Sequence, residues 1–355
     1  MAKTRVVGRN HKGPSAPTDY NEAVHMKAAF QNQFGSPDIL FVKDVAMPVM
    51  GPDQLLVKVH ASPVTQGDRR LRAADYPGIS ALIGRLMFGV FRPKNSIPGT
   101  MFAGRVVGVG DAVTQFSVGD DVFGAVDHSA QAEYLTVGEK GAVAQMPEGT
   151  DYATAAAAPY GAATALSFLR DVGRVQPEEK VLIVGASGGV GRYAVQIARH
   201  LGAHVTGVCS GQHRKMVLSL GAHKVIDYAR EDYTQGESTY DVIFDTSSGG
   251  GFNAARKVLS PAGRYLTVYL NLLVMAQAFV TALVGGRKVR SAVVLGDQDL
   301  TRDVGTLLAE GVIRPVIAEQ FPLDHVVDAH AELEKRSSHG DVLVLIGSPL
   351  PALGS

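Results

Sequence analysis

A glycine-rich turn between an apolar strand and an amphipathic helix is the feature that most constrains the fold of this chain. The stretch begins at Lys180 and runs KVLIVGASGGVGRYAVQIARHLGAHVTGVCS. After the glycines, apolar residues recur at helical spacing, and the strand-like run HVTGVC follows the helix. Further strand-like runs come later, at KVIDY, YDVIFDT and RYLTVYL. Strands that alternate with helices in this way predict a parallel sheet covered on both faces.

The glycines of this turn favour a dinucleotide-binding site. Without a Cβ they permit a tight turn, a close approach of the backbone to a pyrophosphate, and close packing of helix on strand. The helix N-terminus offers free N–H groups and a positive dipole end to phosphates. The alternative is that the glycines only make a tight turn. We expect cofactor contacts from Gly185, Ala186, Ser187, Gly188, Gly189, Val190 and Gly191, although Ala186 stands at the first glycine position of G-x-G-x-x-G.

The end of the second strand bears on which dinucleotide binds. A preference for NAD usually places an Asp or Glu there to hold the ribose hydroxyls. This chain has Cys209 and Ser210, followed shortly by Arg214 and Lys215, with no carboxylate among them. Ser210, Arg214 and Lys215 would suit a 2′-phosphate, so the sequence predicts NADPH as the cofactor. The alternative is that Arg214 and Lys215 are only the polar face of the next helix.

The chain of 355 residues is long enough for two domains. Residues 1–25 are polar and predict a disordered N-terminal extension. Residues 26–150 hold short strand-like runs with Gly and Asp at the turns, which indicates a β-rich domain. Residues 151–320 carry the alternating strands and helices, and residues 321–355 add one helix and one strand.

Composition excludes several kinds of partner and site. The 34 basic and 34 acidic side chains balance, which argues against nucleic acid and against an anionic membrane surface. The single cysteine, Cys209, allows neither an intramolecular disulfide nor a multi-cysteine zinc site. No apolar run near the N-terminus has the length of a secretory signal, so we expect a cytoplasmic protein.

One apolar segment, from Tyr265 to Val284, approaches the length of a membrane span. Asn271 and Gln277 interrupt it, and Gly263 with Arg264 indicates a turn in front of it. The pattern favours a buried strand to about Tyr269 followed by an unusually apolar helix. The alternatives are an apolar wall of a substrate site and a membrane-contacting face.

These motifs resemble the medium-chain dehydrogenase/reductases, and within them the zinc-free quinone oxidoreductase-like branch. The resemblance covers residues 26–347 and includes PGTMFAGRVVGVG from Pro98 and PYGAATAL from Pro159. It implies an α/β fold with two domains. A GroES-like catalytic domain, residues 26–150 with a return of residues 321–355, wraps around a Rossmann-type doubly wound parallel sheet. It also implies an active site in the cleft between them and a homodimer, paired edge to edge through VRSAVVLG at Val289.

The resemblance also bears on metal. Members with catalytic zinc have a cysteine where Thr65 precedes Asp68 and a histidine where Thr100 follows Gly99. The third ligand position, near PYGAATAL, has no cysteine either, and the cysteine-rich lobe for structural zinc is missing. We therefore expect no metal site. Without a Lewis acid, a protein group must supply the proton or polarise a carbonyl.

Tyr76 is the first candidate for that general acid. In the related enoyl-thioester reductases a tyrosine lies eight residues beyond the aspartate, which is where Tyr76 follows Asp68. The alternative is an ordinary loop tyrosine. The resemblance gives Thr65 a role in orienting the nicotinamide ribose or the substrate oxygen, whereas Asp68 and Arg72 are expected to form an internal ion pair. Expected cofactor contacts elsewhere are Thr164, Tyr228 at the adenosine end, Asp245 and Tyr269.

These expectations combine into an NADPH-dependent, zinc-independent reductase of an activated double bond or a quinone. Family members often carry a Lys where Asp341 stands and an acid where Met101 stands, and loss of the Lys weakens the case for an anionic substrate. The apolar MFGVF at Met87 and the apolar segment from Leu270 favour a small hydrophobic acceptor. The alternatives are an NADP-dependent alcohol or aldehyde oxidoreductase, a non-catalytic NADPH-binding protein, and a membrane-associated reductase.

Overall fold

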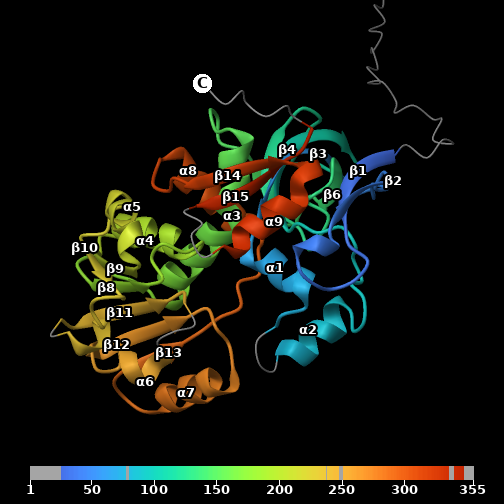
Figure 1. Cartoon of the computed structure of the whole chain (residues 1–355). Coiled ribbons are helices and arrows are strands. Elements are labelled where there is room, and N and C mark those ends of the chain that lie inside the picture. Colours follow the sequence, from blue (N-terminus) through green and yellow to red (C-terminus); the bar gives the residue numbers. More distant parts are fainter. Residues whose placement is uncertain (1–24, 77–79, 237, 248–250, 336–339, 348–355) are drawn as a thin grey trace, which may run out of the picture.

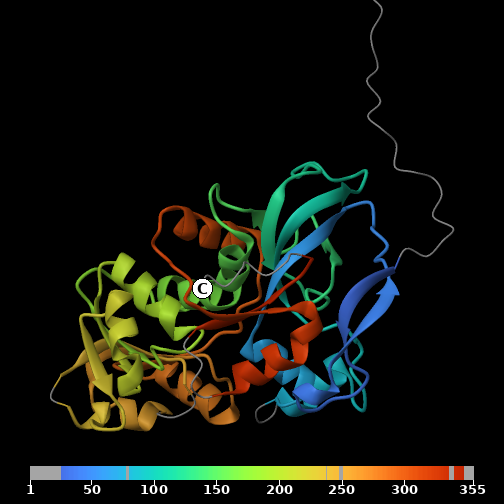
Figure 2. The same ribbon diagram turned by 45° about the horizontal axis from the view of Figure 1, so that its top comes forward.

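A computed structural model describes residues 25–76, 80–236, 238–247, 251–335 and 340–347. The predicted N-terminal extension lies outside these residues, apart from His25, which begins the first strand. The chain forms two large sheets with helices between and around them, one sheet on each side of the molecule in Figure 1. Figure 2 shows the C-terminal strands and α9 lying against the N-terminal part of the chain.

The first sheet is fully parallel and has the strand order β10-β9-β8-β11-β12-β13. This is the doubly wound order in which the first strand of each half lies at the centre. Alternate residues of its strands face opposite sides, so that Val181 and Ile183 pack toward α4 while Leu182 and Val184 pack toward α6 and α7. Its strands are β8 (Lys180–Val184), β9 (His204–Cys209), β10 (Lys224–Asp227), β11 (Tyr240–Asp245), β12 (Leu259–Thr267) and β13 (Lys288–Arg290).

The helices of this half connect those strands. They are α4 (Gly191–His200), η3 (Gly211–His213), α5 (Arg214–Ser219), η4 (Tyr233–Gln235), α6 (Gly251–Ala255) and α7 (Leu272–Leu283). After β13, α8 (Gln298–Ala309) packs on α3 (Tyr152–Leu166) and β7 (Val143–Gln145), so it bridges the two halves.

The second sheet belongs to the other half and has the order β14-β15-β3-β4-β5-β7, with β6 paired to β3. Because β14 and β15 come from the end of the chain, the C-terminal segment returns to the N-terminal half. Its strands are β3 (Gln54–Val64), β4 (Met101–Val109), β5 (Asp121–Ala125), β6 (Tyr134–Gly138), β7 (Val143–Gln145), β14 (Ile317–Pro322) and β15 (Asp341–Leu345). Around it lie β1 (His25–Phe30), β2 (Phe41–Ala46), η1 (Pro37–Ile39), α1 (Gln66–Ala73), α2 (Ser80–Phe88), η5 (Leu323–His325) and α9 (Val326–Glu334).

The helix α3 (Tyr152–Leu166) passes between the two halves and continues as the π-helical turn η2 (Ser167–Val172). The side chain of Asp151 caps its start by accepting a hydrogen bond from the backbone N–H of Thr154. Its alanines let neighbouring elements approach closely, and α3 packs on β3 and β4 on one side and on α4 on the other. It therefore carries residues such as Tyr160 and Thr164 into the space between the halves.

The apolar segment from Tyr265 to Val284 forms a strand and then a helix, as predicted, and differs from the prediction in front of the strand. Strand β12 runs through Gly263, where a turn was predicted, with a register shift against β11 at that place. The strand is buried at Tyr265 and Leu266, as expected, but none of the residues of α7 is buried. Among the described residues, no helix is both long and apolar enough to cross a membrane.

Candidate functional site

The carboxyl ends of β8 and β11 lie side by side at the centre of the parallel sheet. The chain turns away in opposite directions after these strands, which is where doubly wound sheets bind ligands. Gly185 follows β8 with a φ of +81°, a conformation that favours glycine, and Thr246 follows β11. The hydroxyl of Thr246 donates to the carbonyl of Val184 at 2.8 Å and so ties the two strand ends together.

The glycine turn packs directly on the start of α4. A Cβ on Gly191 would lie 2.0 Å from the carbonyl oxygen of Gly185, so no larger residue fits there. The turn also meets α3, because a Cβ on Gly161 would lie 2.3 Å from the carbonyl oxygen of Gly189. The close packing of the helix on the turn, which the sequence predicted from these glycines, is therefore present.

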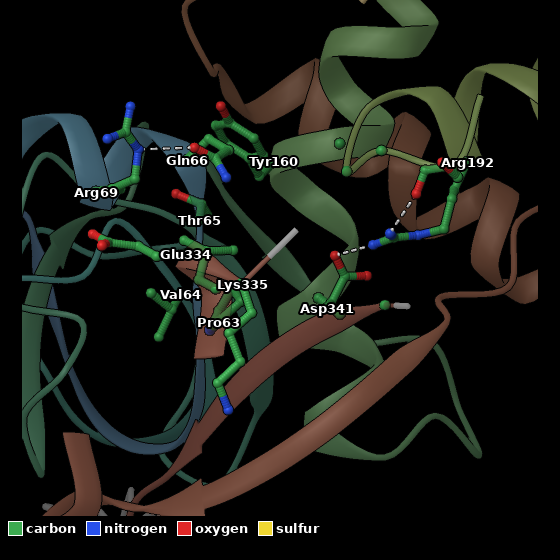
Figure 3. A pocket seen from close by; sticks show the side chains of 17 residues that line it. Pro63, Val64, Thr65, Gln66, Arg69, Tyr160, Arg192, Glu334, Lys335 and Asp341 are labelled. Atoms are coloured by element: carbon green, nitrogen blue, oxygen red, sulfur yellow. Dashed lines mark hydrogen bonds and ion pairs between the residues drawn. The ribbon is translucent and has the colours of Figure 1, made fainter. Parts of the chain in front are cut away.

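Two cavities meet at this turn. The first, of about 570 Å³, lies between the turn and the second sheet and is lined by Thr65, Arg69, Arg192, Glu334, Lys335 and Asp341 among others (Figure 3). The second, of about 480 Å³, lies between the turn and the ends of β11 and β12 and is lined by Arg70, Thr164, Thr246, Tyr269 and Val293 among others. Both cavities share Gln66, Tyr160, Ser187, Gly188 and Gly189.

The second cavity brings together predicted cofactor residues that are far apart in sequence. Thr164 and Tyr269 line it beside the turn residues. Asp245 does not line it and lies underneath, buried. The Asp245 carboxylate accepts hydrogen bonds from the backbone and hydroxyl of Ser247 and from the hydroxyl of Tyr265 at 2.7 Å. Asp245 therefore shapes the loop after β11 and makes no direct contact with the cavity.

The predicted adenosine end lies where β9 and β10 finish. Ser210 follows β9, and the guanidinium of Arg214 donates to the carbonyl of Val225 at 2.8 Å, which holds it near that end. Lys215 and Tyr228 are exposed. The sequence showed no carboxylate in this stretch, but β10 supplies one in space: a Cβ on Gly211 would lie 2.4 Å from the Asp227 carboxylate. That side chain is also 3.7 Å from the guanidinium of Arg230.

Thr65 forms a capping box at the start of α1. Its hydroxyl donates to the Asp68 carboxylate at 2.6 Å and accepts from the Asp68 backbone N–H. The hydroxyl of Thr100 donates to the same carboxylate at 3.0 Å. Burial raises the pKa of the Asp68 carboxyl, and these hydrogen bonds oppose the rise. The Thr65 side chain lines the first cavity, but its hydroxyl is already engaged.

Tyr76 does not lie among the residues that line either cavity. Its ring stacks on Phe88 with centroids 6.0 Å apart, and a Cβ on Gly84 would lie 2.7 Å from it. The Tyr76 hydroxyl is buried against α2 without a hydrogen-bond partner. The spacing from Asp68 that suggested an acid therefore leads to the α2 side of the loop, away from the glycine turn.

The predicted ion pair between Asp68 and Arg72 is wrong. Asp68 accepts hydrogen bonds from Thr65 of the capping box and from Thr100. The buried Arg72 instead forms an ion pair with Glu334 and contacts the Nδ1 of His330 at 2.9 Å. Although the two residues are one helical turn apart, different elements pack against each of them. Burial and the charge of Arg72 lower the pKa of His330 to about 3, so His330 is neutral in this network.

Asp341 has partners that the sequence did not predict. Its carboxylate accepts from the guanidinium of Arg192 at 2.6 Å (Figure 3). It also accepts from the hydroxyl of Tyr193 at 3.1 Å. The guanidinium of Arg192 also donates to the carbonyl of Ser187 in the glycine turn at 3.0 Å. Asp341 belongs to β15 and Arg192 to α4, so this cluster ties the two halves together at the edge of the first cavity.

Two models of known domains match the chain. The model described as Alcohol dehydrogenase GroES-like domain matches residues 51–167, and the one described as Zinc-binding dehydrogenase matches residues 220–344. A mitochondrial NAD(P)H oxidoreductase of Homo sapiens is 30% identical over 90% of this chain and 89% of its own. The chain belongs to the medium-chain dehydrogenase/reductase superfamily.

Other members support its place on the quinone oxidoreductase-like branch. A chloroplastic NADPH-dependent alkenal/one oxidoreductase of Arabidopsis thaliana is 29% identical over 92% of this chain and 80% of its own. The solved quinone oxidoreductase of Coxiella burnetii is 27% identical, with a TM-score of 0.78 over 91% of this chain and 99% of that one.

The predicted family, branch and fold class are therefore confirmed, with a GroES-like domain and a Rossmann-type sheet. The predicted oxidoreductase class and NADP-type cofactor are confirmed at the level of the family by the names of these relatives. The acceptor, the independence from zinc and the homodimer remain predictions. The cytoplasmic location also remains a prediction, because one of these relatives is chloroplastic and another is mitochondrial.

Proposed function

We propose that this protein is an NADPH-dependent, zinc-independent reductase that transfers a hydride to an activated carbon–carbon double bond or to a quinone. The observation that carries the proposal is the second cavity. It joins the glycine turn, where the pyrophosphate would lie, to an apolar wall and to the phenol of Tyr160 in one space of about 480 Å³. A hydride donor, a hydrophobic acceptor and a proton source can therefore meet there.

The proposed cofactor lies across the carboxyl ends of β8, β9 and β11. The N-terminus of α4 and the turn from Gly185 to Gly191 would hold the pyrophosphate. Ser210, Arg214 and Lys215 would hold the 2′-phosphate, since Arg and Lys neutralise its charge. Asp227 is the one observation that opposes NADPH, because its carboxylate lies beside Gly211 in the same region.

Independence from zinc is supported by the side chains at the positions where zinc-dependent relatives have ligands. Protein ligands of zinc are thiolates, imidazoles and carboxylates. The hydroxyls of Thr65 and Thr100 both donate to Asp68, whose carboxylate is thereby engaged. Among the described residues, no group of three or more His, Cys, Asp or Glu side chains is placed to hold a metal ion.

A hydrophobic acceptor is supported by the wall of the second cavity that faces the glycine turn. It consists of apolar side chains after β12 and β13, namely Val268, Leu270, Ala292, Val293 and Val294. Leu270 and Val293 are exposed at its mouth. An acceptor with an apolar tail would bury these groups, which favours an enone or quinone with an alkyl chain over a small polar aldehyde.

The test is a titration with NADPH and with NADH, followed by turnover with 1-octen-3-one and 1,4-naphthoquinone. We expect tight NADPH binding and NADPH oxidation with at least one of these acceptors. Turnover of an alcohol with NADP⁺, in place of these acceptors, would favour the alcohol oxidoreductase alternative. Tight binding without turnover of any acceptor would favour a non-catalytic protein.

We also propose that two copies of the chain pair through the edge of the parallel sheet. Strand β13 forms that edge, and within the described residues no further strand pairs with its outer side. Beside it, α7 exposes the apolar side chains of Leu273, Phe279 and Leu283 to solvent. Light scattering after size exclusion tests this proposal: a monomer at micromolar concentration would contradict it.

A further inference from the structure

Tyr160 stands where the two cavities meet. It lies on α3, and its side chain lines both cavities together with Gln66 and the turn residues Ser187 to Gly189. Figure 3 shows Tyr160 beside Gln66, at the start of α1. No motif pointed to this residue, because the resemblance gives a role in the PYGAATAL run to Thr164 and none to Tyr160. Its position within the second cavity places a phenol next to the expected hydride donor.

The first turn of α1 lies against the ring of Tyr160. The positive charge of Arg70 and the backbone N–H of Gly67 both lower the pKa of the phenol. Both favour the phenolate. Burial acts in the opposite direction and, with the nearby Asp68 and Tyr269, raises the pKa of Tyr160 above its ordinary value. The phenol therefore keeps its proton at neutral pH. Arg70 and the backbone of Gly67 would stabilise the phenolate that forms when the proton leaves.

The capping box fixes where these groups lie. Thr65 and Asp68 hold the first turn of α1 through reciprocal hydrogen bonds, and Thr100 ties Asp68 to the start of β4. A Cβ on Gly67 would lie 3.4 Å from the Tyr160 ring, so the N-terminus of α1 is in contact with the phenol. Thr65 and Asp68 are therefore positioning residues, because they act on the reaction through α1.

We propose that Tyr160 is the proton donor of the reaction, a role that rests on the reductase function proposed above. A bound NADPH would supply a hydride to the β-carbon of an enone, and the substrate would then be an enolate. The O–H bond of Tyr160 breaks, its proton goes to the enolate oxygen, and the electron pair stays on the phenol oxygen. With a quinone, the same hydride and proton give the hydroquinone. Water that enters through the first cavity returns a proton to the phenolate.

The second cavity offers few other donors. Among the described residues that line it, the ionisable side chains are those of Arg70, Tyr160 and Tyr269. An arginine does not release its proton in proteins. The guanidinium of Arg70 lies over the ring of Tyr269, 5.6 Å from its centroid. Both residues line the second cavity. Tyr269 is therefore the rival donor, and the experiment includes it.

The test compares Tyr160→Phe, Tyr269→Phe and the wild type with 1-octen-3-one and 1,4-naphthoquinone. Tyr152→Phe is the matched control, because Tyr152 lies on the same helix and donates its hydroxyl to Asp121 outside both cavities. We expect Tyr160→Phe to lower kcat on the order of 100-fold or more, as loss of a general acid does. Its NADPH dissociation constant should stay within about threefold of the wild type, since a hydroxyl of the acid contributes to the transition state rather than to cofactor binding.

The pH profile separates a proton donor from a merely structural hydroxyl. If solvent must replace Tyr160, kcat of Tyr160→Phe should rise as the pH falls, while kcat of the wild type changes little between pH 6 and 8. If Tyr160→Phe had the same kcat and the same pH profile as the wild type, the inference would be overturned and the reductase function would be left intact. A loss confined to Tyr269→Phe would move the donor to Tyr269. NADPH binding by the wild type without turnover of either acceptor would overturn the function and this role together.

Discussion

The contact between Arg192 and Asp341 makes a quantitative prediction about how the two halves are held together. The side chains are 4% and 16% exposed, and their atoms approach to 2.6 Å. Burial raises the pKa of the Asp341 carboxyl, and the guanidinium of Arg192 only partly opposes this rise. The free energy lost by desolvation of the Asp341 carboxylate is therefore larger than the free energy gained from its attraction to Arg192. The pair as a whole should contribute little net stability, although each partner depends strongly on the other.

Removing one partner should accordingly be costly. Asp341→Leu leaves the guanidinium of Arg192 buried without its counter-charge, and such a change costs on the order of 3 kcal/mol. At about 2–4 °C per kcal/mol this corresponds to a fall in Tm of roughly 6–12 °C. Arg192→Met should cost a similar amount, because it leaves the carboxylate without its counter-charge and with only the hydroxyl of Tyr193 as a partner. The double variant should return to within about 1 kcal/mol of the wild type, since a buried ion pair exchanged for apolar residues is often neutral.

Urea unfolding followed by circular dichroism measures these differences as a double-mutant cycle. Asp299→Asn is the matched control, because Asp299 pairs with Arg302 on α8 but is 92% exposed, and exposed pairs are worth under about 1 kcal/mol. Additive losses in the double variant would refute the reasoning, because they would mean that the two side chains do not depend on each other. A loss in Asp341→Leu no larger than in the control would refute it equally.

Three further predictions address the cofactor, the pH dependence and the glycine turn. Arg214→Ala should weaken NADPH binding about 10- to 100-fold and leave NADH binding unchanged in calorimetry, because it removes a charged hydrogen bond to the 2′-phosphate; equal losses for both cofactors would contradict that assignment. The pKa of His330 lies near 3 and below its unfolded value of 6.5, so folding favours the neutral ring: its contribution is complete above pH 6.5 and is lost as the pH falls toward 3. His330→Gln should therefore reduce the slope of unfolding free energy against pH in that window, by up to about one proton, and an unchanged slope would show that His330 does not titrate there. Gly191→Ala should reduce the affinity for NADPH below the detection limit of calorimetry, because its Cβ would lie 2.0 Å from the carbonyl oxygen of Gly185. An affinity equal to that of the wild type would mean that the turn can shift to admit the Cβ.

Local patterns were sufficient to predict most of the fold. The strand–turn–helix–strand run from Lys180 indicated the parallel sheet, and β8, α4 and β9 lie where that run placed them. The register shift at Gly263 was not predictable in this way, because it depends on how β12 pairs with β11. The exposure of α7 was not predictable for a related reason, because an apolar sequence does not show whether its side chains pack against the rest of the same chain.

The site shows the same division between spacing and direction. Residues of the glycine turn were predictable because a single motif contains all of them. Tyr76 and Arg72 were placed from their distance to Asp68 along the chain, and both side chains turn toward other elements, one to α2 and the other to α9. Spacing along one element indicates which residues can be close, but the elements packed around it decide which way each side chain points.

Tyr160 could have been found only by combining two facts that no motif connects. It lies inside a helix so rich in alanine that the pattern indicates packing and nothing more. That packing is the cause of its position, because small side chains let α3 lie between the two sheets and bring one of its few large polar residues against the first turn of α1. A capping box that fixes α1 then places Gly67 against the ring of Tyr160. The same physical features that make α3 a core helix thus place a proton donor in the cleft, where the variants of Tyr160 test it.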